Sequence, residues 1–179
     1  MSDLAFLTVR RMREDDLELV RGWRNHTKVR QSMLTQHEIT PLEHRSWYDR
    51  RSSDASFALL LIEEHAEAIG CVIFSNVGLG STAEWSFYAK PSSPAGVGTR
   101  ICSAAIDFAF HELRVHKVVG QVLAYNNGSI RLHQRLGFSK EGILRQHCQI
   151  NGRYIDLLCF GMLASEWQRS PRLATKPSP

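Results

Sequence analysis

The fold of this 179-residue chain is decided by residues 83–99, which read AEWSFYAKPSSPAGVGT. The aromatic-rich residues 83–89 predict a strand, and the prolines at positions 91 and 94 end it. A helix is expected from about Gly98 to Leu113, because apolar residues recur there at helical spacing, namely Ile101, Ala104, Ala105 and Phe108. The stretch therefore predicts a strand, a glycine turn and a helix, in that order.

The glycine turn predicts an anion site. Gly96 and Gly98 have no side chains, so backbone N–H groups can approach an anion closely, and the first turn of the helix points unpaired donors at the same place. Arg100 and Ile101 stand where an ATP-binding loop needs lysine or a dinucleotide-binding loop needs a third glycine, which disfavours both of those sites. A phosphate or pyrophosphate is expected on the backbone of Ala95, Gly96, Val97, Gly98 and Thr99.

A second strand-to-helix block follows further along the chain. Residues 117–125 read as a strand, and the helix after it stops at Gly137, a natural C-terminal cap. Asn126 is expected to cap this helix three residues before Ser129.

The rest of the chain predicts further strands and helices around these two blocks. Residues 40–43, Thr-Pro-Leu-Glu, have the pattern of a helix start, and Asn151-Gly152 is typical of a hairpin turn between residues 141–150 and 154–162. A strand is expected at 4–12, a helix at 14–25, a helix at 41–51, three adjacent antiparallel strands at 56–63, 68–75 and 83–89, and a short helix from 165.

The two blocks together resemble the GNAT superfamily of acetyl-CoA-dependent N-acetyltransferases. The resemblance is carried by GVGT at 96–99 and by NNGSIRLHQRLGF at 126–138, and it extends from about Phe6 to Trp167. The family loop is usually written [QR]-x-x-G-x-[GA], so Ser93 replaces one polar side chain but leaves the backbone cradle intact. The resemblance implies an α+β fold with a mixed, mostly antiparallel sheet of about seven strands, helices on both faces, and two parallel strands splayed at the cofactor site.

The resemblance also implies how acetyl-CoA binds. The pantetheine arm enters between the splayed strands and pairs with the main chain of Phe87, Tyr88 and Ala89, where an N–H near Phe87 or Tyr88 polarises the thioester carbonyl. Asn126 and Ser129 are expected beside the same arm, although capping alone accounts for Asn126.

Three side chains are candidates for proton transfer. Many relatives have tyrosine where this chain has His133, which can donate a proton to the leaving thiolate as imidazolium, or else serve only in packing. Tyr125 is the second candidate donor. Glu84 is the candidate base for the substrate ammonium, and a surface carboxylate without a catalytic role is the alternative.

The acceptor amine is suggested by residues scattered over the first quarter of the chain and the two blocks. At these positions the sequence resembles the acetyltransferases of pseudaminic acid biosynthesis, which act on the 4-amino group of a UDP-linked dideoxy amino sugar. Cationic side chains would suit the two phosphates of the UDP group, and flat apolar side chains would suit its base. The candidate acceptor-binding residues are Arg24, Arg30, Met33, His44 and Trp47. Two alternatives stay open: a Rim-type acetyltransferase of protein or peptide N-termini, and a noncatalytic module that binds acetyl-CoA.

Composition sets the remaining expectations. Residues 1–168 are expected to form a single domain, and 169–179, with three prolines, a disordered tail. The formal net charge of +4 suits an anionic cofactor but is too small to indicate nucleic-acid binding. No membrane span or secretory signal is recognised, so a cytoplasmic protein is expected. An exposed edge strand is compatible with a homodimer. No metal site is expected, and four cysteines are expected to be buried and reduced, namely Cys71, Cys102, Cys148 and Cys159.

Overall fold

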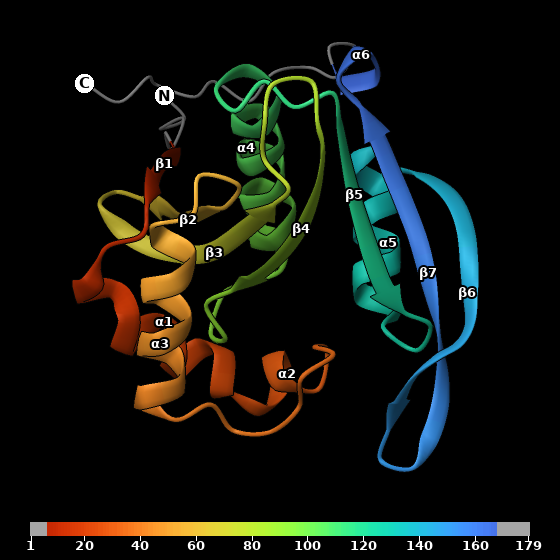
Figure 1. The fold of residues 1–179 in the computed structure, drawn as a ribbon, viewed down its shortest axis with the longest axis horizontal. Helices are drawn as coiled ribbons and strands as arrows, with labels where there is room; N and C mark the ends of the chain where they lie inside the picture. Colours follow the sequence, from red (N-terminus) through yellow and green to blue (C-terminus); the bar gives the residue numbers. More distant parts are fainter. Residues whose placement is uncertain (1–6, 168–179) are drawn as a thin grey trace.

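The computed structural model describes residues 7–167, which form one seven-stranded sheet with helices on both faces (Figure 1). The strand order is β1-β2-β3-β4-β5-β7-β6, and β4 and β5 are the parallel pair. The strands are β1 (Leu7–Arg11), β2 (Ala58–Glu64), β3 (Glu67–Ser75), β4 (Thr82–Ala89), β5 (Lys117–Leu123), β6 (Ser139–Ile150) and β7 (Arg153–Leu163). The helices are the 3₁₀ turn η1 (Glu14–Asp16), α1 (Leu17–Asn25), α2 (Thr27–Arg30), α3 (Pro41–Ser52), α4 (Val97–His111), α5 (Asn127–Leu136) and α6 (Ala164–Trp167).

The core lies in two layers, one on each face of the sheet. Helices α4 and α5 pack on one face, and α1, α2 and α3 contribute to the cluster on the other. Strand β2 shows why both layers exist: Leu60 and Ile62 join the α4 layer, whereas Leu59 and Leu61 join the α1 layer. A strand covered on both faces is apolar along a continuous run, which is how the first five residues of β2 read in the sequence.

The parallel strands β4 and β5 separate soon after they meet. Their pairing is limited to Thr82–Glu84 with Lys117–Val119, while β4 continues along β3 to Ala89 and β5 continues along β7 to Leu123. Figure 1 shows the two strands together at one end and apart at the other. The splayed pair expected from the sequence is therefore present.

Trp85 and Gly120 come directly after the last paired residues of these two strands. A Cβ atom on Gly120 would lie 2.6 Å from the indole Nε1 of Trp85 and 2.8 Å from Nε2 of His133. Real Cβ atoms do not approach other heavy atoms so closely, so only glycine fits here. The indole of Trp85 thus occupies the space above β5 where the strands part.

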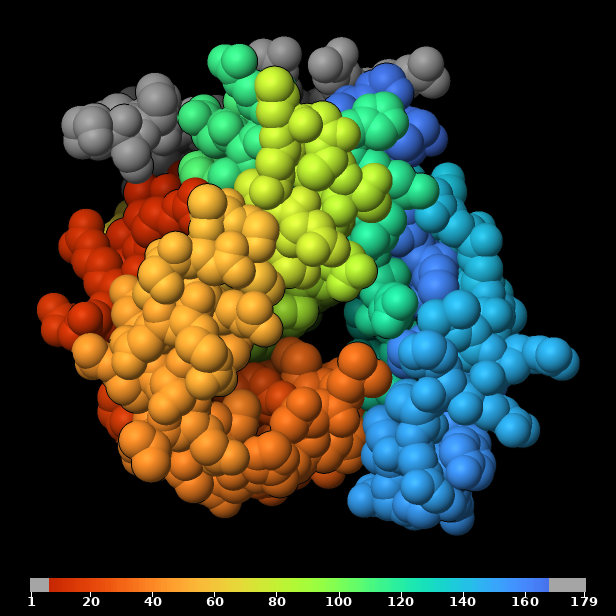
Figure 2. All heavy atoms as spheres, in the orientation of Figure 1, coloured from red at the N-terminus to blue at the C-terminus, as the bar shows by residue number. Residues whose placement is uncertain are grey.

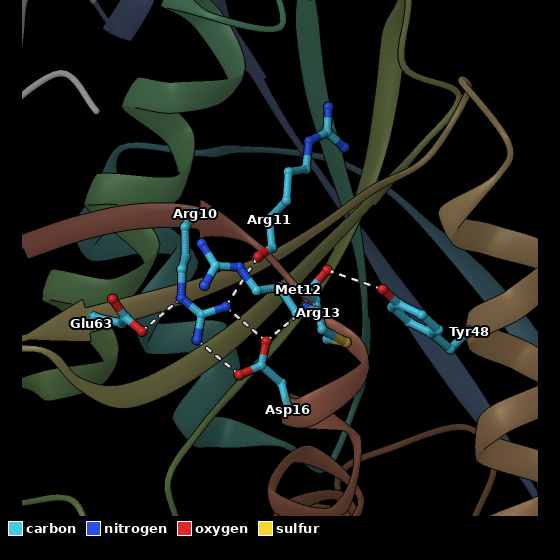
Figure 3. Close-up of polar contacts among 7 residues, drawn as sticks. All are labelled: Arg10, Arg11, Met12, Arg13, Asp16, Tyr48 and Glu63. Carbon is cyan, nitrogen blue, oxygen red and sulfur yellow. Dashed lines mark hydrogen bonds and ion pairs between the residues drawn. The ribbon is translucent and has the colours of Figure 1, made fainter. Parts of the chain in front are cut away.

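Polar contacts connect β1 to the elements beside it (Figure 3). The guanidinium of Arg10 donates from Nη1 and Nη2 to both carboxylate oxygens of Asp16, at 2.7 and 2.8 Å, and from Nε to Glu63 at 2.7 Å. The hydrogen bond from Arg10 holds the pKa of Asp16 below its ordinary value. The Tyr48 hydroxyl donates to the carbonyl of Met12 at 3.3 Å, which ties α3 to the same strand end.

Most of the expected elements are found, and the capping signals are accurate. Thr40 and Glu43 form the reciprocal capping box of α3, and Asn151 and Gly152 both have positive φ, at 50° and 76°, as a two-residue hairpin turn requires. The single helix expected at 14–25 is divided into η1 and α1, and the strand expected to reach Tyr125 ends at Leu123. Helix α2 was not anticipated.

Other expectations have mixed outcomes. All four cysteines are free, and Cys71 and Cys102 are buried as expected. The expected burial is wrong for Cys148 and Cys159, which are partly exposed because they lie on β6 and β7, toward the sheet edge. Residues 169–179, the expected tail, lie outside the described residues. No helix within 7–167 is long and apolar enough to cross a membrane. In the same range, no group of three or more His, Cys, Asp or Glu side chains is placed to hold a metal ion.

Candidate active site

A cavity of about 800 Å³ lies where β4 and β5 part. In the space-filling view an opening is visible between the orange N-terminal part of the chain and the green and teal parts (Figure 2). The sheet supplies one wall of the cavity and the segment from α1 to α3 supplies the other.

The sheet wall contains an open backbone slot. Beyond Glu84, no residue of β4 is paired with β5 in the described sheet, and Phe87, Tyr88 and Ala89 line the cavity from β4. Backbone N–H and C=O groups that face a gap between strands can pair with an extended amide chain, as an added strand would. Glu84 and Ser86 are exposed on β4 and line the same cavity.

The glycine turn expected to bind an anion lies directly before α4. Gly96 adopts the left-handed φ of 92° as the N-cap of α4, and a Cβ atom there would meet no atom of residues 7–167 within 4 Å. Gly98 lines the cavity, whereas the other residues of the predicted anion site do not, namely Ala95, Gly96, Val97 and Thr99. Helix α4 begins at Val97, one residue before the expected start, and its first turn adjoins the slot.

The start of α5 borders the slot from the other side. The side-chain oxygen of Asn126 accepts the N–H of Ser129 at 3.1 Å, so the expected cap is present, and both residues line the cavity. Arg135, further along α5, donates from Nη1 to the Thr99 hydroxyl at 3.3 Å. This contact brings a cation beside the glycine turn.

His133 lines the cavity but is only 2% exposed. Its ring contacts four aromatic rings at centroid distances of 5.0 to 5.8 Å, namely Trp85, Phe87, Phe138 and Phe160. Nδ1 lies 2.8 Å from the carbonyl of Ser129, and Nε2 accepts from Trp85 Nε1 at 3.3 Å. Burial lowers the pKa of His133, so the neutral ring with its proton on Nδ1 fits both contacts. This arrangement disfavours proton donation and favours packing.

Tyr125 follows β5 and is not among the residues that line the cavity. Its hydroxyl donates to the carbonyl of Gln31 and accepts from the side-chain amide of Gln36, both at 3.1 Å. The second candidate donor is therefore occupied by contacts to the segment between α2 and α3.

The expected acceptor residues divide into two groups. Arg24, Met33 and Trp47 line the cavity, whereas Arg30 and His44 do not. Arg30 forms an ion pair with Glu38 at 3.7 Å. His44 is 5% exposed and stacks on Trp47 at a centroid distance of 5.2 Å, and burial lowers its pKa. His44 thus supports the Trp47 ring from behind the cavity wall.

Comparison with known proteins decides the family. Residues 7–139 match the family model of the acetyltransferase (GNAT) domain. The chain belongs to this GNAT family. The uncharacterized N-acetyltransferase YokL of Bacillus subtilis, derived from the SPbeta prophage, is 30% identical over 69% of this chain and 71% of its own length. Acetyltransferase PseH of Campylobacter jejuni is 30% identical over 72% of this chain and 80% of its own length.

The structural comparison agrees on the fold. A spermidine N-acetyltransferase from Vibrio cholerae, solved in complex with CoA and spermine, superposes with a TM-score of 0.83 and 24% sequence identity, covering 91% of this chain and 98% of that one. Together with the family match, these relatives identify the protein as an acetyl-CoA-dependent N-acetyltransferase of the GNAT family.

The structure of this GNAT enzyme adds charged residues that sequence reasoning missed. Lys28 and Arg51 line the cavity beside Arg24, and the Arg51 guanidinium lies 4.1 Å from the centre of the Phe57 ring. Arg24 donates from Nη2 to the carbonyl of Thr35 at 2.7 Å, and its Nη1 is buried without a hydrogen-bond partner among residues 7–167. Neither Lys28 nor Arg51 belongs to a motif, so only the packing of α1, α2 and α3 reveals these two residues.

Proposed function

We propose that this GNAT enzyme acetylates the 4-amino group of a UDP-linked dideoxy amino sugar, as in the pseudaminic acid pathway. The observation that carries the proposal is the positive charge of the cavity wall formed by the segment from α1 to α3, here called the helix wall. Arg24, Lys28 and Arg51 line it, and within residues 7–167 none of them forms an ion pair with a carboxylate. Three such cations beside a cavity favour an acceptor that brings its own negative charge.

The same wall supplies surfaces for the rest of such a molecule. Trp47 and Phe57 line the cavity with flat rings on which a uracil base can stack, and Met33 adds an adaptable apolar contact. The likeness to PseH over most of the chain supports this acceptor. A polyamine, the acceptor class named for the Vibrio cholerae neighbour, would bring positive charge to a wall that already carries three cations.

In the proposed complex, acetyl-CoA occupies the slot between β4 and β5. Its pantetheine amides pair with the backbone of Phe87, Tyr88 and Ala89, and Asn126 and Ser129 border the arm on the α5 side. The pyrophosphate lies on the backbone N–H groups of residues 95–99, where Arg135 supplies the cation that Ser93 cannot.

The proposed reaction is a direct attack of the amine on the thioester. Glu84 removes a proton from the substrate ammonium, the amine nitrogen bonds to the carbonyl carbon, and a backbone N–H near Phe87 or Tyr88 stabilises the oxyanion. The oxyanion then collapses and the C–S bond breaks, the thiolate takes the second proton from the amine nitrogen, and Glu84 passes the first proton to solvent. His133 holds Trp85 at the mouth of the slot and donates no proton in this scheme.

A thiol-release assay tests the proposed acceptor. We expect release of free CoA with a UDP-linked 4-amino sugar, with kcat/KM at least about 100-fold above that for spermidine or for peptides with free N-termini, since unpaired buried polar groups discriminate strongly against the wrong ligand. Faster reaction with peptides would support the Rim-type alternative. Calorimetric binding of acetyl-CoA without turnover of any amine would support the noncatalytic module.

A charge substitution separates recognition of the anion from the chemistry. We expect Arg51→Met to raise the KM for the UDP-linked 4-amino sugar about tenfold, because one charge-assisted contact is lost, and to leave the KM for acetyl-CoA unchanged. Arg50→Met is the matched control, since Arg50 is adjacent on α3 but exposed and outside the cavity lining. Equal effects of the two variants would remove Arg51 from the proposed site.

A further inference from the structure

Residues 31–36 form a segment whose middle residues line the cavity and whose two end residues are held by hydrogen bonds. Ser32, Met33, Leu34 and Thr35 all line it. The residues on either side, Gln31 and Gln36, meet at the Tyr125 hydroxyl: it donates to the Gln31 carbonyl and accepts from the Gln36 amide. The amide of Gln36 also donates to the carbonyls of Gln31 and Met33, at 3.2 Å each.

Several hydrogen bonds hold this segment to α1, whereas only those of Tyr125 hold it on the opposite side within residues 7–167. Toward α1, Asn25 exchanges two hydrogen bonds of 2.8 Å with the backbone of Ile39, and Arg24 donates to Thr35. On the opposite side, the segment faces the part of the chain after residue 90. Within residues 7–167, the hydrogen bonds between residues 26–40 and that part are the two made by the Tyr125 hydroxyl. They bridge the cavity, because Tyr125 follows β5 while the segment follows α2.

We propose that Tyr125 is a positioning residue for acetyl transfer, whose hydroxyl fixes residues 31–36 across the cavity and thereby shapes the acceptor wall. Tyr125 is 45% exposed and lies outside the cavity lining, so its hydroxyl acts through the segment and not on the reacting atoms. Without the hydroxyl, the segment retains its α1 anchors but loses its position over the slot. The acceptor site then has to be ordered during binding, which weakens acceptor affinity.

Steady-state kinetics of Tyr125→Phe test this assignment with the amine that reacts fastest in the panel above. We expect the acceptor KM to rise about 5- to 30-fold, the effect of losing one or two hydrogen bonds. The KM for acetyl-CoA should stay within about twofold, because its proposed site lies on other elements. Tyr154→Phe is the matched control, since Tyr154 is also exposed but lies on the β6–β7 hairpin.

A second variant excludes a direct catalytic role of the phenol. Gln36→Leu removes the shared contact from the other side, so we expect the acceptor KM to rise in this variant as well. Because the two variants lose this hydrogen bond in common, the double variant should show less than the product of the two single effects. A fall of about 100-fold in kcat confined to Tyr125→Phe would overturn the proposal and make Tyr125 a proton donor.

Hydrogen–deuterium exchange gives a readout that needs no substrate. In both variants, peptides covering residues 31–40 should exchange faster than in the wild type, while peptides from α4 should not change. This result can be obtained even if the UDP-sugar proposal fails. Unchanged exchange together with an unchanged acceptor KM in both variants would overturn the positioning role.

Discussion

Gly120→Ala is expected to lower the free energy of unfolding by about 1–3 kcal/mol, because the added methyl overlaps the Trp85 and His133 rings. Neither ring can move easily. Trp85 stacks on Phe138 at a centroid distance of 5.3 Å, and His133 is enclosed by aromatic rings and bonded to Ser129. The backbone of β5 must therefore shift at the mouth of the slot. A displacement of about 1 Å there should reduce kcat/KM for acetyl-CoA about 100-fold.

Urea unfolding and thiol-release kinetics measure these two effects together. Gly142→Ala is the matched control: Gly142 also lies in a strand, and a Cβ atom there meets nothing within 4 Å in the part of the chain that the structure describes. We expect the control to retain both stability and activity. Wild-type kinetics in Gly120→Ala would show that the contact between Trp85 and Gly120 does not set the width of the slot.

The elements that sequence analysis predicted well are those whose signals are local. The capping box at Thr40, the hairpin turn at Asn151-Gly152 and the glycine at the N-cap of α4 each require a particular backbone geometry from neighbouring residues alone. The parallel pair, in contrast, followed from the family resemblance, because the two blocks define its strands.

The parts of the site that sequence analysis missed depend on contacts between distant residues. The Tyr125 hydroxyl, for example, contacts Gln36 and Gln31, which lie 89 and 94 positions earlier in the chain. The surroundings of His133 are another example, since its aromatic neighbours come from β4, from the residue just before β6 and from β7. A histidine in a family motif position can be assigned a role only when those neighbours are known.

Glu84→Gln is expected to have the largest effect on the chemistry itself. Glu84 is the last residue of β4 that pairs with β5, opposite Val119, and it is exposed and lines the cavity. If acetyl-CoA fills the slot, this position is beside the thioester end. A positioned base contributes about 10²- to 10⁴-fold, so kcat/KM for the acceptor should fall at least about 100-fold at pH 7.

The pH dependence of this variant distinguishes a base from a structural residue. The amide side chain in Glu84→Gln cannot accept a proton, but the amine becomes neutral without help as the pH rises toward its own pKa, so the activity of the variant should recover at alkaline pH. Glu141→Gln is the control, because Glu141 also lines the cavity while its carboxylate is held 2.6 Å from the Lys117 ammonium. Loss of activity by the same factor at every pH would instead mean that Glu84 shapes the site and that solvent removes the proton.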